Sequence, residues 1–165
     1  MKPRVYLCGP INGCTDEECN GWRALARDLF GDDAYLVDPM RRDYRGREDL
    51  AYRELVELDK VDVGLCDVVL ASCPKPSVGT SMEVLWAWER GKMVVAVVPL
   101  CDVVSPWLRY HSTFLARTYG EAVQFILEFY TSLDPRGSWL GRDLPPLGRD
   151  LPPRAREPRY DREGA

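Results

Sequence analysis

The 165-residue sequence lacks several patterns that would point to common functions. It has one histidine, His111, so neither a histidine-based catalytic triad nor a histidine-rich zinc site has support. No GxxxxGK(S/T) loop is present, and no GxGxxG follows the first apolar run, which argues against two common phosphate-binding loops. No run approaches about 18 apolar residues, so a membrane-spanning helix is not expected. The net charge of −4 argues against non-specific binding to a nucleic-acid polymer.

Cysteine is more frequent, yet its spacing does not indicate a metal site. None of the six cysteines forms a CxxC pair, and Cys8, Cys66 and Cys73 lie in or beside apolar runs. We therefore expect small buried side chains with reduced thiols, as in a cytoplasmic protein. The first four residues lead directly into an apolar run and do not resemble a signal peptide.

Short apolar runs alternate with segments of helical spacing. Strands are predicted at residues 5–8, 34–37, 67–71, 92–98 and 115–118. Helices are predicted from a capping box at residues 15–18, over 48–65, through 82–89, from Pro106, and over 120–133. In the second of these, the apolar side is expected to comprise Leu50, Leu55, Leu58, Val61 and Leu65. This alternation predicts an α/β fold with five strands in a mostly parallel sheet and helices on both faces.

The composition changes after residue 133. LGRDLPP at residues 140–146 is repeated at 147–153, and proline, arginine and aspartate dominate to the end. We expect one domain over residues 1–133 and an extended or disordered proline-rich tail over 134–165. An alternative is that Leu144 and Leu151 in the repeats dock the tail on a neighbour. The protein would then be an interaction protein whose tail is the functional part.

The segment PSVGTSME at residues 76–83 joins the third strand to an apolar helix. Gly79 permits a tight turn or a close backbone approach, and Thr80 or Ser81 is expected to cap the helix. Glu83 would then lie in the first turn. Its carboxylate is either a charge that favours the helix N-terminus or a nucleophile held over a pocket.

Topology brings distant residues together at the carboxyl edge of the sheet. The first and third strands end at the switch point where such sheets bind ligands, so Tyr6, Asn12 and Glu83 are expected in one crevice. The remaining candidates for chemistry are carboxylates, namely Glu83, Asp59 and Asp38. Two carboxylates facing one cleft suit cleavage of a glycosidic bond.

These residues resemble the nucleoside 2-deoxyribosyltransferase family, including its relatives that hydrolyse 2′-deoxynucleoside 5′-monophosphates. The resemblance covers about residues 4–130. It rests on VYLCGP at 5–10, Asp59 eight residues before Asp67, SVGTSME at 77–83 and SPW at 105–107.

The resemblance implies a flavodoxin-like domain that forms homo-oligomers with shared active sites. It implies Glu83 as the nucleophile that forms a covalent glycosyl-enzyme in a retaining double displacement. Asp59 is implied as the acid/base residue, and Tyr6 as the residue that orients Glu83. It implies no metal and no organic cofactor.

The resemblance leaves the substrate open between a free 2′-deoxynucleoside and its 5′-monophosphate. At position 77 the transferases usually carry an aspartate that holds the 5′-hydroxyl; Ser77, like Ser105, matches the nucleotide hydrolases and favours the monophosphate. Pro10 and Asn12 match the transferases instead. The candidate substrate-binding residues are Gly9, Asn12, Asp38, Ser77, Gly79 and Ser105.

The sequence leaves three questions open. The arginines at 41, 42, 45 and 47 would either supply positive charge for a phosphate or form a solvated basic loop. Release of the sugar by water and its transfer to a second base are equally compatible with these residues. A catalytically silent nucleotide-binding module is the main alternative to an enzyme.

Overall fold

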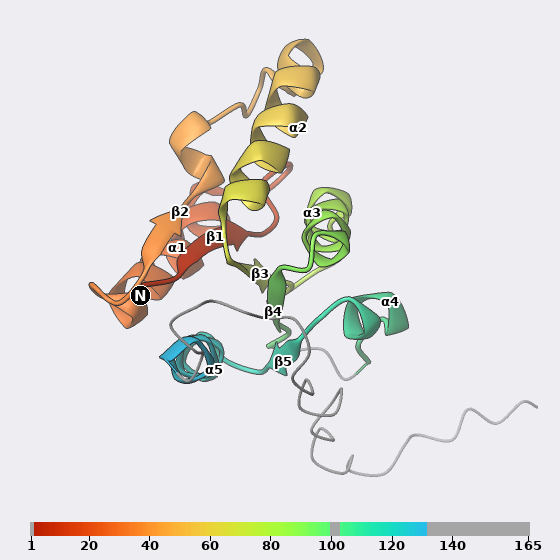
Figure 1. Ribbon diagram of the computed structural model, residues 1–165. Helices are drawn as coiled ribbons and strands as arrows, with labels where there is room; N and C mark the ends of the chain where they lie inside the picture. The colour runs from red at the N-terminus through yellow and green to blue at the C-terminus, as the bar shows by residue number, and fades with distance from the viewer. Residues whose placement is uncertain (1, 100–102, 132–165) are drawn as a thin grey trace, which may run out of the picture.

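The computed structural model describes residues 2–99 and 103–131, which form a three-layer α/β domain (Figure 1). Five strands build its sheet: β1 (Arg4–Cys8), β2 (Tyr35–Val37), β3 (Val68–Ser72), β4 (Met93–Val97) and β5 (Phe114–Ala116). The predicted tail over 134–165 and its repeats lie outside the described residues.

All strand pairings within the described residues are parallel, and the strand order is β2-β1-β3-β4-β5. Tyr6 of β1 pairs with Val69 of β3 and with Val37 of β2. This order is that of flavodoxin-like sheets, with the switch point between β1 and β3. The predicted fold class is therefore confirmed for the described part of the chain, with parallel pairing throughout the sheet.

Helices cover both faces of the sheet (Figure 1). One face carries α1 (Asp16–Phe30) and α5 (Tyr119–Thr131); the other carries α2 (Glu48–Leu65) and α3 (Val78–Glu89). The predicted capping box of α1 forms, since Thr15 Oγ1 accepts from the Glu18 N–H and the Glu18 carboxylate accepts from the Thr15 N–H. Two short elements complete the domain: the 3-10 helix η1 (Pro39–Arg42) and α4 (Pro106–Tyr110). None of the helices described is long and apolar enough to cross a membrane.

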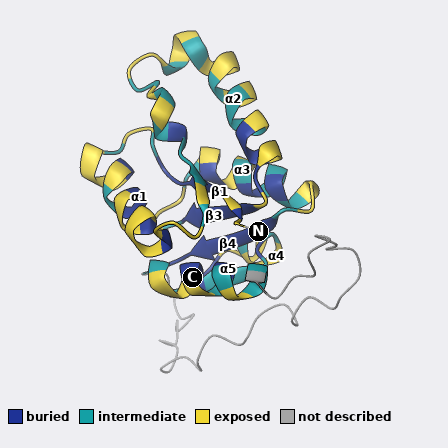
Figure 2. Ribbon diagram, turned by 60° about the vertical axis from the view of Figure 1, so that its left-hand side comes forward, coloured by how far each residue is buried: buried dark blue, intermediate teal, exposed yellow. Residues whose placement is uncertain are grey.

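The alternation of side chains along β1 divides the core into two clusters. Val5 and Leu7 point toward α1 and α5, whereas Tyr6 and Cys8 point toward α2 and α3. All four side chains are fully buried, and β1, β3 and β4 form the dark interior of Figure 2. Tyr6 and Cys8 therefore lie on the same face of the sheet as helix α3.

Helix α2 differs from its predicted packing. Leu50, Val61 and Leu65 were expected on a buried apolar side, but they are 90%, 54% and 60% exposed. Asp62 and Val63 are the residues of α2 that are buried. The reason is that most of α2 extends beyond the sheet, so little of the helix has a surface to pack against (Figure 1).

Helix α3 begins earlier than predicted. Its N-cap is Ser77, whose Oγ accepts from the Thr80 N–H, so the expected cap at Thr80 or Ser81 is wrong. Thr80 is instead buried in the first turn, while Glu83 lies in the second turn rather than the first. The unpaired N–H groups of the helix end therefore cannot be what stabilises the Glu83 carboxylate.

Gly9 follows β1 and allows helix α1 to pack closely. A Cβ atom at this position would lie 2.7 Å from Cζ2 of Trp22 and 3.2 Å from Cβ of Ser72. Gly79 is different, because a Cβ there would meet no atom within 4 Å and the backbone makes no tight turn. The tight-turn interpretation of Gly79 is wrong.

Gly9→Ala is expected to lower the free energy of unfolding by about 1–3 kcal/mol, the usual cost of overpacking a close contact. Gly79→Ala, as the matched control, should leave stability unchanged or raise it by up to about 1 kcal/mol, because alanine favours a helix. Urea denaturation of both variants measures the difference. Equal stability of Gly9→Ala and the native chain would contradict this packing.

Candidate active site

Glu83 is held by two side chains of strand β1. The Tyr6 hydroxyl donates to Glu83 Oε1 at 2.7 Å, and the Cys8 thiol donates to Glu83 Oε2 at 2.9 Å. Tyr6 and Cys8 are two residues apart on one face of β1, so both donors reach the same carboxylate. The structure thus joins the predicted Tyr6–Glu83 pair, and it adds Cys8.

The pKa of Glu83 is raised to about 7, mainly by burial and also by the negative charge of Asp59. The hydrogen bonds from Cys8 and Tyr6 and the positive charge of Arg23 act in the opposite direction because they favour the ionised form. The result is a carboxyl group whose charge changes near neutral pH. Such a group can serve as a nucleophile once ionised.

Asp59 lies on α2, on the same side of the sheet as Glu83. Burial raises its pKa, and the charge of Asp62 adds to this effect; Arg42 and the Tyr6 hydroxyl oppose it. Arg42 Nη2 lies 3.2 Å from Asp59 Oδ1. Asp59 of α2, Glu83 of α3 and the Tyr6 hydroxyl therefore influence one another's charge.

Three of the four arginines of the charged loop are paired with acidic residues, whereas Arg47 donates to the backbone carbonyl oxygen of Asp43. Arg41 Nη2 donates to both oxygens of Asp62 at 2.6 Å, and Arg42 reaches Asp62 as well as Asp59. Arg45 contacts Asp43 and Asp16. These ion pairs compensate the positive charge that was expected to face a phosphate or solvent. The pairs of Arg41 and Arg42 with Asp59 and Asp62 also hold η1 against α2.

Ser77 and Ser105 precede two helices. Ser77 Oγ accepts from the Thr80 N–H at 3.3 Å and from the Thr80 hydroxyl at 3.0 Å, which fixes its side chain at the N-terminus of α3. Ser105 precedes Pro106 of α4 and makes no capping hydrogen bond with its side chain. Its side chain is exposed, as is that of Asn12 in the loop after β1.

Asp38 binds neighbouring side chains and backbone. Its carboxylate lies 3.3 Å from Arg23 Nε, pairs with Arg27, and accepts from the Met40 N–H at 2.9 Å. Arg23 itself is fully buried and donates to the carbonyl oxygens of Cys19, Leu7 and Gly9. The Trp22 ring covers its guanidinium at 4.5 Å. These contacts explain a structural role for Asp38.

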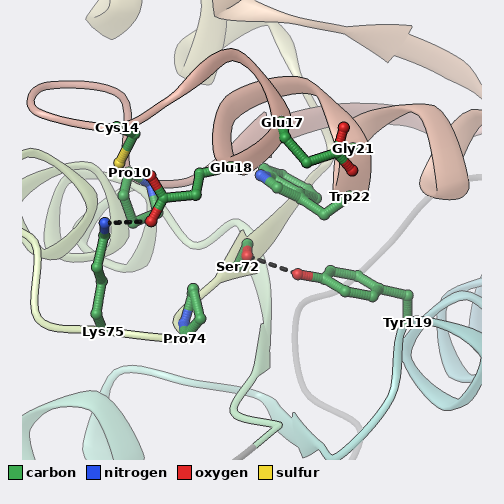
Figure 3. Close-up of a pocket in the computed structure, with 10 residues that line it drawn as sticks. All are labelled: Pro10, Cys14, Glu17, Glu18, Gly21, Trp22, Ser72, Pro74, Lys75 and Tyr119. Carbon is green, nitrogen blue, oxygen red and sulfur yellow. Dashed lines mark hydrogen bonds and ion pairs between the residues drawn. The ribbon is translucent and has the colours of Figure 1, made fainter.

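A hollow of roughly 380 Å³ opens on the side of the sheet that α1 and α5 cover (Figure 3). Trp22 and Tyr119 stack in its wall at 5.7 Å, and the Tyr119 hydroxyl lies 2.7 Å from Ser72 Oγ. Lys75 and Glu18 form an ion pair of 2.8 Å at its rim. Glu83, Tyr6 and Asp59 do not line this hollow. No group of three or more His, Cys, Asp or Glu residues in residues 2–99 and 103–131 is arranged to hold a metal ion.

Sequence reasoning missed three contributors to this region: Cys8, Arg23 and Asp62. Cys8 was assigned to the core, yet its position two residues after Tyr6 is the signal that places it on the same face. Arg23 and Asp62 carried no comparable signal, because charged residues on a helix are usually exposed.

Comparisons with known proteins agree with the fold. A scan with models of protein families and a search of curated proteins find no match to this sequence. Among solved structures, a CMP N-glycosidase from Clostridium botulinum matches with a TM-score of 0.51 and 18% identity, over 74% of this chain and 97% of that one. A 2-deoxyribosyltransferase from Leishmania mexicana matches with a TM-score of 0.56 and 16% identity, over 76% of this chain and 97% of that one. A 2-deoxyribosyltransferase from Bacillus psychrosaccharolyticus matches with a TM-score of 0.57 and 13% identity, over 81% of this chain and 93% of that one. At these identities the likeness establishes a shared fold.

The raised pKa of Glu83 predicts how stability depends on pH. The folded carboxyl titrates near 7 and an ordinary one near 4.5, so between these values the folded chain binds more protons than the unfolded chain. The free energy of unfolding should therefore fall as pH rises through this window. Glu83→Gln removes this pH dependence, so the melting temperature of the variant minus that of the native chain should be higher at pH 8 than at pH 5.

Thermal melts at both pH values measure the effect. Glu89→Gln is the control, because Glu89 is exposed at the end of the same helix. A constant difference between Glu83→Gln and the native chain at the two pH values would contradict the assigned pKa.

Proposed function

We propose that this chain is an enzyme that cleaves the N-glycosidic bond of a 2′-deoxynucleoside, with the 5′-monophosphate as the preferred substrate. The observation that carries the proposal is the Glu83 carboxylate, held by the Tyr6 hydroxyl at 2.7 Å and influenced by a second carboxyl group, Asp59. The shared fold with an N-glycosidase and two 2-deoxyribosyltransferases supports it.

The chemistry follows from the two carboxyl groups. Ionised Glu83 attacks C1′ of the sugar while the bond to the base breaks, and the electron pair of that bond goes to the base nitrogen. Protonated Asp59 gives its proton to the departing base. The sugar is then an ester of Glu83. Water or a second base attacks C1′, Asp59 takes the proton of the attacking group, and Glu83 is released as a carboxylate.

The environment of each carboxyl group suits its proposed role. Tyr6 and Cys8 fix the orientation of Glu83 and favour its ionised form. Burial and Asp62 raise the pKa of Asp59, as an acid near neutral pH requires. Because the charge of Asp59 raises the pKa of Glu83, the two groups titrate as a pair, and one proton shared between them suffices for the first step.

We assign the phosphate to the N-terminus of α3. Ser77 caps that helix, and the helix end favours an anion. Lys75, two residues earlier, lies in the same loop, but its charge is paired with Glu18. Gly79 leaves open space above the first turn, and Asn12, Gly9 and Ser105 are assigned with Ser77 to the substrate site. The close bonding of Asp38 to Arg23 and Arg27 makes it the weakest member of that set.

Homo-oligomerisation is part of the proposal. Leu50, Val61 and Leu65 on α2 and Val78 and Met82 on α3 are all more than half exposed, and the two helices pack on each other. We assign this apolar surface to contact with a second copy of the chain. A monomer in sedimentation analysis would contradict this. The five free cysteines of the described residues are compatible with the proposed cytoplasmic location.

Glu83→Ala should lower base release by more than about 1,000-fold while leaving the fold intact, because no group replaces the nucleophile. Asp59→Asn should lose about 100- to 10,000-fold on ordinary deoxynucleotides. The rate of base release by Asp59→Asn should recover with N7-methylated 2′-deoxyguanosine monophosphate, because its cationic base leaves without needing a proton. The rate of Glu83→Ala should not recover with this substrate. Liquid chromatography of the released base measures both. Base release by Glu83→Ala at the native rate would contradict the role of Glu83. Failure of Asp59→Asn to recover with the N7-methylated substrate would contradict the role of Asp59.

Ser77→Asp should reduce use of the 5′-monophosphate relative to the free nucleoside by about tenfold or more, because aspartate repels a phosphate. Aspartate is also a good N-cap, so the fold should persist. Ser77→Ala is the uncharged control. Each deoxynucleoside and its monophosphate are incubated with native and variant protein, with and without a second base. The products also distinguish hydrolysis from transfer; an unchanged substrate ratio in Ser77→Asp would refute the phosphate assignment.

A further inference from the structure

Cys8 contacts Glu83 directly, although the proposed mechanism needs no thiol. Its Sγ lies 2.9 Å from Glu83 Oε2 and 3.8 Å from the carbonyl oxygen of Thr80. The side chain is fully buried at the end of β1. One thiol has one proton, and the nearer, charged acceptor is the carboxylate, so the S–H group donates to Glu83.

The thiol is a donor rather than a thiolate. Burial raises the pKa of Cys8 well above its ordinary value, and the negative charge of Glu83 adds to this effect. The proton therefore stays on sulfur throughout the pH range in which Glu83 titrates.

We propose that Cys8 is a positioning residue: its thiol fixes Oε2 of Glu83 toward strand β1 and leaves this oxygen, rather than Oε1, as the atom that attacks the sugar. The inference rests on the proposed function. A hydroxyl is a stronger donor than a thiol, so the Tyr6 bond withdraws more electron density from Oε1 than the Cys8 bond withdraws from Oε2. Oε2 is thus held in place yet remains the better nucleophile.

The second acceptor of Cys8 accounts for the change that follows attack. Once Oε2 bonds to C1′, it carries less negative charge and accepts the thiol more weakly. The Thr80 carbonyl oxygen at 3.8 Å is then the alternative acceptor, so the S–H group need not remain unsatisfied in the buried site. The sulfur keeps its proton, and no bond to it forms or breaks.

Four side chains set the titration of Glu83: Cys8 and Tyr6 from β1, Asp59 from α2 and Arg23 from α1. Cys8 is the one that can be replaced by both a stronger donor and a non-donor of similar size. Cys8→Ser should move the Glu83 midpoint below its native value near 7, because a hydroxyl stabilises the carboxylate more strongly. Cys8→Ala should move the midpoint upward.

The test titrates the side-chain carboxyl carbon of Glu83 by ¹³C NMR in the native chain and in both variants. Glu83→Gln identifies the signal. Cys66→Ala is the matched control, since Cys66 is fully buried in the same core cluster and has no bond to Glu83 among those described. Cys8→Val replaces Cys8→Ala if the smaller side chain fails to fold.

The expected result is opposite shifts in Cys8→Ser and Cys8→Ala, with Cys66→Ala unchanged. In base-release assays kcat of Cys8→Ala should fall about tenfold with little change in KM, as loss of one hydrogen bond predicts. Above both midpoints, kcat of Cys8→Ser should also fall, because a hydroxyl withdraws more electron density from Oε2 than the thiol does. Identical midpoints in all variants, or an equal shift in Cys66→Ala, would overturn the inference. The NMR titration uses no substrate, so absence of base release from any deoxynucleotide would refute the proposed function separately.

Discussion

The cost of burying one carboxylate determines how the carboxyl edge of this sheet is built. Glu83 projects from α3 toward the sheet, and taking its charge out of water is unfavourable unless polar groups compensate it. Tyr6 and Cys8 supply two hydrogen bonds from a single strand, and Arg23 contributes positive charge from the other side of the sheet. The pKa of Glu83 nevertheless remains raised to about 7, so the compensation is partial. A partly compensated carboxylate is chemically more reactive than one in a strong ion pair.

The positive charge behind this site is itself buried and has its own supports. Arg23 is fully buried, with its guanidinium between the Trp22 ring, the Asp38 carboxylate and three backbone carbonyl oxygens. A buried charge of this kind persists only when paired and hydrogen-bonded. Asp38 therefore supports the site indirectly, through Arg23 and the cap of η1. Gly9 belongs to the same arrangement, because a larger residue would displace the Trp22 ring.

The acidic residues of α2 form a second network beside the first. Arg42 bridges Asp59 and Asp62, while Arg41 donates to both carboxylate oxygens of Asp62. Asp59 thus lies between a cation that lowers its pKa and a buried environment that raises it. Movement of Arg42 would change that balance, which links the position of the loop at residues 39–47 to the protonation of the proposed acid.

The sequence by itself determined the elements and the sheet. Alternating apolar runs and capped helices are local signals, and the carboxyl edge of a parallel sheet follows from topology alone, so Tyr6 and Glu83 were expected in one crevice. Asp59 was a candidate carboxylate from the sequence, and the resemblance implied its role as the acid/base residue. Tertiary structure decided what depends on distant partners: the start of α3 at Val78 and the exposure of α2. It also decided the pairing of the loop arginines and the thiol of Cys8 on Glu83. Periodicity shows which side of an element is apolar, but what that side meets is set by packing between segments far apart in the chain.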